Sequence, residues 1–446
     1  MRLTLVKPNL GRMEHSLYVD EGRMEPLQLG VLAGITPPGV EISLCDDRCE
    51  EIDYDAPADL VAITVETFTA RRAYEISAEF RRRGRRVVLG GFHPTLLPEE
   101  AAQHADAIVT GDAEPVWEMV IADAQAGRLQ SHYRAAPDAR RTAQNGRLPN
   151  RELFRGRGYL PITLMQFGRG CPNDCEFCAI SAYFARRHTF RPVADVVREI
   201  EAQDRRLVFF VDDNIVADHA AAKELFRALI PLRLRWVSQG CIDMVHDREL
   251  MDLMVASGCL GHVIGFESIE AETLEGMRKG GNLGSRFTGY EREIAILKEY
   301  GLQTWAAFTL GHDRDTPESL YRLLDFALAH KFTFAAFNVL MPYPNTPFYR
   351  RLQAEGRLLY DGRWWLHPQY RFNHAAFQPR GMAADELTAI AFDIRSRWNS
   401  PVAMVRRFLD PRTNLRSLHR MAIYWLYNPL FRRETFKKQG LRFGRN

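Results

Sequence analysis

Short apolar runs alternate with amphipathic stretches through the first 130 residues of the chain. Each apolar run is followed by turn or polar residues, and this pattern predicts strands at Arg2–Lys7, Glu41–Cys45, Leu60–Val65, Arg86–Leu89 and Ala107–Val109. Helical stretches lie between them, and Ala70–Arg83 ends in a basic cluster that suits a helix C-terminus. Strands and helices that alternate at this spacing predict a doubly wound α/β domain.

A second alternating series begins near residue 159. Its apolar runs predict strands at Ile162–Phe167, Leu207–Val211, Arg235–Gln239, His262–Phe266, Gln303–Leu310 and Phe334–Leu340. The stretches between them predict helices at Val193–Gln203, Ala220–Ala228, Asp247–Ala256, Tyr290–Tyr300 and Pro317–His330. Six β/α units in succession predict a partial (β/α)6 barrel, whose chemistry lies at the C-terminal ends of its strands.

These patterns predict an α/β protein in four parts. Residues 1–130 form a Rossmann-like domain, 131–158 an arginine-rich linker with interspersed Gly and Pro, and 159–370 the barrel. Residues 371–446 form a mainly helical, basic and aromatic C-terminal region, with a helix expected at Asp385–Arg397.

Composition narrows the class of protein. The 446 residues are 46% hydrophobic with a net charge of +3, which excludes wholesale disorder and does not indicate a nucleic-acid binder. We see no secretory segment and no run of the roughly 20 apolar residues that a spanning helix needs. We therefore expect a cytoplasmic protein, where clustered cysteines are more often metal ligands than disulfides.

Three of the seven cysteines stand together as Cys171, Cys175 and Cys178. Structural zinc sites and closed iron–sulfur clusters normally take four protein ligands. Three thiolates in eight residues therefore favour an iron–sulfur cluster with one iron open to a small molecule. The alternatives are buried thiols or a zinc site lacking a ligand, and no fourth Cys or His lies in the loop.

The Cys-x-x-x-Cys-x-Phe-Cys run resembles the motif of the radical S-adenosylmethionine (SAM) enzymes. The resemblance implies a [4Fe–4S] cluster whose open iron chelates SAM, with Phe177 near the adenine. One electron from such a low-potential cluster cleaves the sulfonium bond of SAM and leaves a deoxyadenosyl radical.

Polar residues that follow the predicted barrel strands extend this resemblance. It implies that Asp212 and Asp213 contact the methionyl amine of SAM and that Glu267 and Ser268 contact its ribose. Polar residues that end apolar strands are also ordinary strand caps, and that alternative stays open. Three further residues are weaker catalytic candidates, each with a structural alternative: His312 as a surface histidine, Tyr343 as part of a rigid turn, and Cys241 as a small hydrophobe.

Glycines follow two neighbouring strands of the first domain. Gly90, Gly91 and Gly111 remove side-chain bulk where an open α/β sheet binds ligands. Together with the barrel behind it, this domain resembles the cobalamin-binding domain of one radical SAM subclass, which includes bacteriochlorophyll-pathway cyclases and hopanoid methylases. The segments that carry the resemblance, and that would bind cobalamin, are Gly90, Gly91, His93, Pro94 and Thr95 with Gly111 and Glu114.

One departure from cobalamin proteins concerns the cobalt ligand. The Asp-x-His-x-x-Gly motif is absent, and Asp46-Asp47-Arg48-Cys49 occupies the corresponding loop. Cobalt ligation from the protein therefore cannot be carried over, and a module that only packs or captures substrate remains the alternative.

The resemblance implies a cobalamin-dependent radical SAM methyltransferase that acts on an unactivated carbon of a hydrophobic or secondary-metabolite substrate. A non-methylating cyclase, oxidoreductase or rearrangement enzyme of the same architecture is the alternative, followed by a non-catalytic cluster or cobalamin sensor. The expected partners are a small-molecule substrate and an external one-electron reductant of the flavodoxin or ferredoxin type, with no nucleic acid.

The C-terminal segment is strongly basic. Residues 401–446 carry eleven Lys or Arg and only two acids, around the aromatic run Met421–Tyr427. Such a segment suits peripheral contact with an anionic membrane surface. It equally suits a helix that packs its aromatic face on the barrel and leaves its charges in water.

Overall fold

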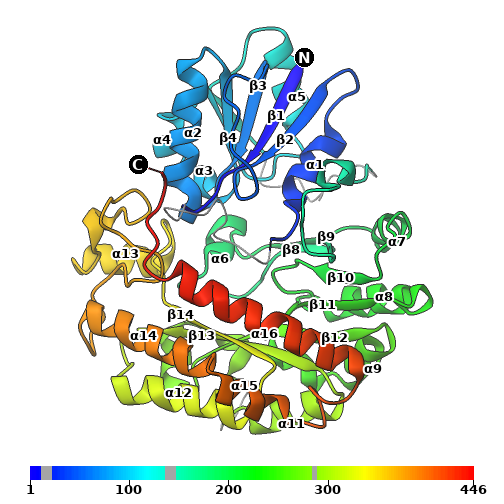
Figure 1. Ribbon diagram of the computed structural model, residues 1–446, viewed down its shortest axis with the longest axis vertical. Coiled ribbons are helices and arrows are strands. Elements are labelled where there is room, and N and C mark those ends of the chain that lie inside the picture. The colour runs from blue at the N-terminus through cyan, green and yellow to red at the C-terminus, as the bar shows by residue number, and fades with distance from the viewer. Residues whose placement is uncertain (12–22, 136–146, 284–288, 446) are drawn as a thin grey trace. The chain divides into compact units, whose positions relative to one another are not determined.

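The computed structural model describes residues 1–11, 23–135, 147–283 and 289–445 and divides into two compact units (Figure 1). Unit 1 combines Met1–Leu160 with Arg363–Phe372 and Gly440–Asn446, and unit 2 combines Pro161–Gly362 with Asn373–Gln439. These units are defined by packing and each includes segments that are distant in the chain. The four consecutive parts expected from the sequence therefore remain a prediction. Part of the expected linker, residues 136–146, lies outside the described residues.

Unit 1 contains one parallel six-stranded sheet. Its order is β2-β1-β3-β4-β5-β6, the doubly wound arrangement of flavodoxin-like domains with one extra edge strand. The strands are β1 (Arg2–Lys7), β2 (Glu41–Asp46), β3 (Leu60–Thr64), β4 (Arg86–Gly90), β5 (Ala107–Thr110) and β6 (His132–Arg134). The first five agree with the predicted strands to within a residue or two.

Helices complete unit 1 around this sheet. They are α1 (Leu27–Ile35), α2 (Ala70–Arg82), α3 (Phe92–Leu96), α4 (Pro98–Ala102) and α5 (Trp117–Gln125), with 3-10 turns at Thr67–Thr69 and Arg151–Phe154. The core lies between sheet and helices and includes the fully buried Leu5, Leu60 and Val120. Burial on both faces explains why the strands read as continuous apolar runs.

Unit 2 is built on a second parallel sheet of six strands. The spatial order β14-β13-β12-β11-β10-β7 follows the order in the chain, which is the one-way winding of a barrel that does not close into a full ring. The strands are β7 (Thr163–Met165), β10 (Leu207–Phe210), β11 (Arg235–Gly240), β12 (Cys259–Glu267), β13 (Gln303–Leu310) and β14 (Phe334–Val339). A short antiparallel pair, β8 (Gly168–Gly170) and β9 (His188–Phe190), brackets the cysteine motif.

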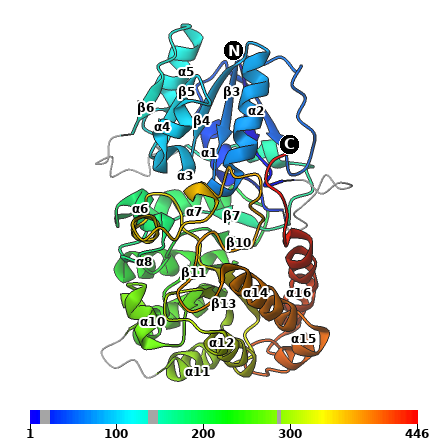
Figure 2. The same ribbon diagram turned by 90° about the vertical axis from the view of Figure 1, so that its left-hand side faces the viewer.

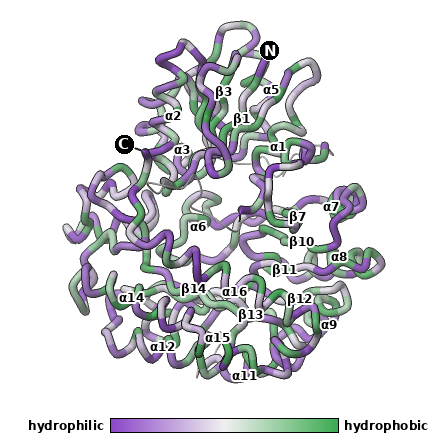
Figure 3. The backbone as a smooth tube through the Cα atoms, in the orientation of Figure 1, coloured by the Kyte–Doolittle hydropathy of each residue, from purple (hydrophilic) through white to green (hydrophobic). Residues whose placement is uncertain are grey.

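Helices cover one side of this sheet and extend into the C-terminal region (Figure 2). They are α6 (Ala179–Phe184), α7 (Val193–Glu201), α8 (His219–Leu229), α9 (Arg248–Ala256), α10 (Ala271–Gly276), α11 (Glu291–Glu299), α12 (Pro317–Ala329), α13 (Pro347–Ala354), α14 (Ala384–Trp398), α15 (Pro401–Phe408) and α16 (Leu418–Lys438). The 3-10 turns of unit 2 are Ile230–Leu232, Ile242–His246, Gly280–Asn282 and Tyr360–Gly362. Hydrophobic segments run through the strands of both sheets (Figure 3).

The expected fold class, two successive α/β parts followed by helices, is therefore confirmed. Within the described ranges, no helix combines the length and the apolar character needed to cross a bilayer.

Candidate functional site

The cysteine motif lies in a loop at the C-terminal end of the first barrel strand. Cys171, Cys175 and Cys178 follow β7 and β8 and precede α6. Cys175 is buried and the other two thiols are half-buried. Ser181 Oγ donates to the carbonyl of Asn173 at 2.9 Å, and the Cys178 N–H donates to the carbonyl of Cys175 at 3.1 Å. These bonds hold the backbone of the loop on either side of Cys175.

The three thiols fit an iron–sulfur cluster. The pKa of Cys175 is raised to about 12, chiefly by burial; Lys279 lowers it, and the nearby Cys178, Glu267 and Cys171 add to the rise. Buried thiols that would repel one another as thiolates need a positive group, which iron supplies. Among the described residues, no three Cys, His, Asp or Glu side chains converge on one ion. In a cluster each thiolate binds a different iron, so the thiols need not converge.

Asp212 and Asp213, at the end of β10, hold the backbone of the cysteine loop. The buried Asp212 carboxylate accepts from the N–H groups of Phe167, at 3.0 Å, and Gly168. Asp213 accepts from the Gly170 N–H at 2.7 Å. Burial raises the pKa of Asp212 to about 7. Both carboxylates therefore position the loop, and their predicted contact with the methionyl amine of SAM stays a prediction.

Cys241 lies directly beside the cysteine loop. Its Sγ accepts from the side-chain amides of Asn173, within the loop, and Asn214, after β10, both at 3.3 Å. Asn214 also approaches Cys171 Sγ at 4.0 Å. Burial raises the pKa of Cys241 to about 11, so the thiol is protonated at neutral pH. This placement brings Cys241 to the site, and its catalytic role remains a prediction.

A buried ion pair stands at the end of β12. Lys279 Nζ lies 3.0 Å from Glu267 Oε1, and only 12% and 10% of these two side chains are exposed. Glu267 adopts a left-handed φ of 64°, and a Cβ on Gly265 would fall 2.4 Å from its Oε1. Strain of this kind is held only where the surroundings impose it. The close approach of glycine backbone and the strained residue fix the carboxylate in place.

Lys279 was missed by the sequence reasoning. Burial alone would lower its pKa, but Glu267 and the thiols of Cys175 and Cys241 outweigh burial and raise the pKa. Its ammonium therefore stays charged, and its charge lowers the pKa of Cys175 in the cysteine loop. The signal in the sequence is weak, a lone lysine in the run Arg278-Lys279-Gly280-Gly281.

The segment that carries Lys279 is tied to the cysteine loop by its backbone. The Glu176 N–H donates to the Met277 carbonyl at 3.0 Å. Asn282 Nδ2 donates to the carbonyls of Gly265, at 2.8 Å, and Phe266, at 3.0 Å. Lys279 is thereby held between the end of β12 and the cluster loop.

The remaining predicted SAM contacts lie nearby. Ser268 Oγ accepts from the Glu270 N–H at 3.1 Å, a local bond in the turn that follows β12. Phe177 is half-buried and packs against the barrel core. The ribose and adenine contacts expected for these residues remain predictions.

His312 is a buried histidine, and the surface alternative for it is wrong. The N–H groups of Gly311 and His312 donate to the Asp315 carboxylate at 2.8 and 2.9 Å. Burial lowers the pKa of His312 to about 4, so the imidazole is neutral near pH 7. A Cβ on Gly276 would lie 2.6 Å from the ring, which shows how closely α10 approaches it.

Tyr343 lies in the turn after β14. Thr346 Oγ donates to its carbonyl at 2.7 Å, and the Thr346 N–H does so at 3.2 Å. These bonds form the rigid turn that the structural alternative expected. A substrate contact for the half-buried ring stays a prediction.

In unit 1, the strand ends of β4 and β5 are joined by Thr95. Its Oγ donates to the Gly91 carbonyl at 2.8 Å and accepts from the Gly111 N–H at 3.0 Å. Gly91 has a φ of 106°, and a Cβ there would lie 3.0 Å from the Val65 carbonyl. A Cβ on Gly90 would meet nothing nearer than 3.7 Å. The edge is therefore open at Gly90 and closed at Gly91.

His93 and Pro94 are buried behind this edge, and Glu114 is half-buried after β5. His93 Nε2 lies 2.9 Å from Glu100 Oε1, and its Nδ1 lies 3.4 Å from Thr67 Oγ1. The imidazole therefore has structural partners, and cobalamin contacts by these residues remain predictions.

The loop after β2, where many cobalamin proteins carry a histidine, is filled by ion pairs. Arg48 Nη2 lies 2.8 Å from Asp46 Oδ2, and Arg72 Nε lies 2.9 Å from Asp47 Oδ2. Tyr159 OH also donates to Asp46 at 2.8 Å. The acids of this loop are therefore paired within unit 1.

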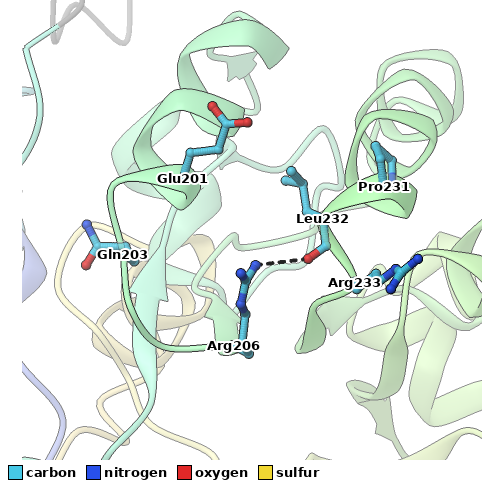
Figure 4. Close-up of a pocket in the computed structure, with 6 residues that line it drawn as sticks. All are labelled: Glu201, Gln203, Arg206, Pro231, Leu232 and Arg233. Atoms are coloured by element: carbon cyan, nitrogen blue, oxygen red, sulfur yellow. Dashed lines mark hydrogen bonds between the residues drawn. The ribbon is translucent and has the colours of Figure 1, made fainter.

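A cavity of about 600 Å³ lies at the opposite end of the barrel sheet (Figure 4). Arg206 and Arg233, which precede β10 and β11, line it with Glu201, Gln203, Pro231 and Leu232. Barrel chemistry occurs at the C-terminal ends of strands. This cavity therefore does not belong to the cysteine site.

Comparison with known proteins agrees with this geometry. The family model of the radical SAM superfamily matches residues 165–327. The chain is 28% identical over 397 residues to bacteriochlorophyllide d C-12(1)-methyltransferase of Chlorobaculum tepidum, covering 86% of this chain and 84% of that protein. It is 30% identical over 361 residues to bacteriochlorophyllide d C-8(2)-methyltransferase of the same organism, covering 76% and 78%.

The fold also has a solved counterpart. The radical SAM methyltransferase TsrM from Kitasatospora setae, with cobalamin and a [4Fe–4S] cluster bound, matches with a TM-score of 0.63 at 22% identity. The match covers 79% of this chain and 78% of that one. With its three-cysteine loop at the mouth of a partial barrel and these relatives over most of its length, the chain belongs to the radical SAM superfamily, in the group that contains the bacteriochlorophyllide methyltransferases.

Proposed function

We propose that the protein is a cobalamin-dependent radical SAM methyltransferase that methylates an unactivated carbon of a hydrophobic small molecule. The observation that carries the proposal is the coincidence of two features. The three-cysteine loop, with Cys175 buried and Cys171 and Cys178 half-buried, offers three thiols to the cluster. Two relatives, matched over 86% and 76% of this chain, are both named as methyltransferases of bacteriochlorophyllide d, a large tetrapyrrole.

The cofactors supply the reactive chemistry: the cluster supplies the electron that cleaves SAM, and cobalamin supplies the methyl group. The chain binds and orients these cofactors and excludes water from them. Asp212 and Asp213 hold the cysteine loop by its backbone, and Lys279 keeps a positive charge beside it. That charge suits the carboxylate of SAM. In unit 1, the open edge at Gly90 admits a flat cofactor without steric conflict.

The substrate class follows from the relatives named above and from a third, the hopanoid C-2 methylase of Rhodopseudomonas palustris, 26% identical over 271 residues. Tetrapyrroles and hopanoids are both large, apolar ring systems. We therefore propose a hydrophobic polycyclic substrate, a one-electron reductant of the flavodoxin or ferredoxin type, and peripheral contact with a membrane.

The test is an anaerobic reaction of the reconstituted protein with SAM, cobalamin, reductant and a hydrophobic extract. We expect deoxyadenosine, S-adenosylhomocysteine and a product heavier by one methyl group, and none of these from Cys175→Ala. The main alternative is a cyclase, because a magnesium-protoporphyrin ester cyclase of Rubrivivax gelatinosus is 25% identical over 398 residues. Deoxyadenosine formed with a modified but unmethylated product, and no S-adenosylhomocysteine, would favour that alternative.

A further inference from the structure

Exposed apolar side chains gather on the two C-terminal helices of unit 2. Seven of the eleven large hydrophobic side chains exposed among the described residues lie between Val402 and Phe436. Six of them form what we call the C-terminal apolar face: Val402, Val405 and Leu409 of α15 and its end, and Leu418, Trp425 and Leu426 of α16. Their exposed fractions run from 42% to 83%. Apolar side chains gathered in this way on the surface of a folded protein indicate a site that binds a partner.

Helical spacing places each set on one side of its helix. Val402, Val405 and Leu409 follow an i, i+3, i+7 pattern, whereas Ala403 and Met404 between them are buried. Leu418 and Trp425 are likewise seven residues apart.

The two sets lie on adjacent helices. The Trp425 ring contacts the Phe408 ring with centroids 5.1 Å apart, and α15 and α16 lie side by side (Figures 1 and 2). The exposed apolar residues of the C-terminal apolar face therefore lie on two helices that pack against each other.

Packing on α15 and on the barrel uses buried residues of α16. Towards α15, Tyr424 OH donates to the Met404 carbonyl at 2.6 Å, and Asn428 Oδ1 accepts from Arg407 at 3.2 Å. Phe431 packs on Trp305 with centroids 4.8 Å apart. The packing alternative expected from the sequence thus explains the buried side of the helix but leaves the C-terminal apolar face unexplained.

Positive charge surrounds this face. Arg406, Arg412 and Arg416 are exposed, and their side chains have no ion-pair partner in the described part of the chain. The two acids of the region are already paired: Asp410 with Lys298 at 2.8 Å and Glu434 with Lys438 at 3.3 Å. The basic charge is therefore available to an anionic partner.

We infer that α15 and α16 bind the surface of an anionic lipid bilayer, with the C-terminal apolar face in the boundary between headgroups and acyl chains. Aliphatic and Trp side chains on helices that lie in the interface, flanked by arginine, match the chemistry of that boundary. Anionic headgroups complement Arg406, Arg412 and Arg416. The inference deepens the proposed membrane contact and does not depend on the proposed chemistry. It assigns the contact to α15 as well as to the aromatic run.

The test is flotation of the reconstituted full-length protein with vesicles of phosphatidylcholine alone or mixed with phosphatidylglycerol. We expect binding to the mixed vesicles that weakens in high salt. Two exposed substitutions, Val405→Ser with Leu426→Ser, should weaken binding about tenfold or more. Arg406→Gln with Arg412→Gln and Arg416→Gln should weaken it by roughly 10- to 100-fold. Ile230→Ser, which changes an exposed apolar residue outside the face, should leave it unchanged.

Several outcomes would overturn the inference: no flotation, equal binding to neutral vesicles, or variants that float like the parent protein. Self-association in sedimentation velocity that Leu426→Ser abolishes, without lipid binding, would instead identify the face as an interface between copies. Thermal melts establish that the variants fold. Deoxyadenosine formation in vesicle-free buffer is measured in parallel, so that failure of the lipid contact and failure of the proposed chemistry are separate results.

Discussion

The two sheets of this protein end their strands in different chemistry. In unit 2, the ends of β10 and β12 carry buried charged groups, namely Asp212 and the Glu267–Lys279 pair. In unit 1, the ends of β4 and β5 carry Gly90, Gly91 and Gly111 instead. One edge is organised by charge and the other by the absence of side chains. Parallel sheets expose the same backbone edge, so the residues at strand ends decide what each edge can bind.

The acids that do lie near the edge of unit 1 are committed to partners. Glu100 Oε1 accepts from His93 at 2.9 Å and from Trp365 Nε1 at 3.0 Å, and Asp47 pairs with Arg72. Their charge serves the internal packing of unit 1. In unit 2, by contrast, the positive charge of Lys279 lowers the pKa of the Cys175 thiol in the cysteine loop. This difference makes the two edges separable by mutation.

The largest effect is expected at the cysteine loop. Cys175→Ser should abolish cluster binding and lower deoxyadenosine formation by about a thousandfold or more, because the open-iron cluster has three protein ligands. Iron content and the visible absorption of the reconstituted protein measure the loss. Cys49→Ser, at a half-buried thiol of unit 1, is the matched control and should retain iron. Full iron content in Cys175→Ser would contradict the assignment of the loop.

The ion pair at the end of β12 tests whether charge organises the edge of unit 2. Lys279→Met leaves Glu267 buried without its partner, and breaking such a pair costs about 3–5 kcal/mol of unfolding free energy. Chemical denaturation measures the loss.

The double variant Lys279→Met with Glu267→Gln removes both charges and should recover most of that stability. SAM affinity, measured by equilibrium dialysis, should stay reduced in the double variant. Recovery of SAM affinity together with stability would mean that the pair is only structural.

The comparison also shows what the sequence can predict. The bounds of β1 and β13 were predicted to the residue, because long apolar runs bounded by polar residues carry their own signal. The three-residue strands β6, β8 and β9 were missed, since their conformation is set by the strand they pair with. Lys279 was missed for a similar reason. It stands 104 residues after Cys175, and only the fold brings the two together.

The sequence does not indicate which later segments of the chain pack with unit 1. Arg363–Phe372 and Gly440–Asn446 belong to it, although both follow the barrel in the chain. Their contacts are specific and distant: Trp365 donates to Glu100, and the Phe372 N–H donates to the Leu441 carbonyl at 2.9 Å. A residue pattern with no local period cannot indicate such pairing.

The pairing of Glu100 predicts a dependence of stability on pH. Burial alone would raise its pKa, but hydrogen bonds from His93, Trp365 and Arg363 outweigh burial and lower the pKa to about 2. Because the folded-state pKa lies below the usual 4.5, the stabilisation is present above pH 4.5 and is lost as pH falls toward 2. The loss is about 3 kcal/mol at most. Urea denaturation across this range should show it, and Glu100→Gln should remove this part of the pH dependence.

The smallest effects are expected for two glycine substitutions at the edge of unit 1, which distinguish a role in stability from a role in leaving space for a ligand. Gly91→Ala places a side chain at φ 106° and 3.0 Å from the Val65 carbonyl, which should cost about 1–2 kcal/mol. Gly90→Ala meets nothing nearer than 3.7 Å and should change stability by less than about 0.5 kcal/mol. If this edge receives cobalamin, Gly90→Ala should nevertheless weaken cobalamin binding in a spectrophotometric titration, because the added methyl group occupies space needed by the ligand. Unchanged cobalamin affinity in Gly90→Ala, with normal stability, would mean that the glycines serve only the packing of the sheet.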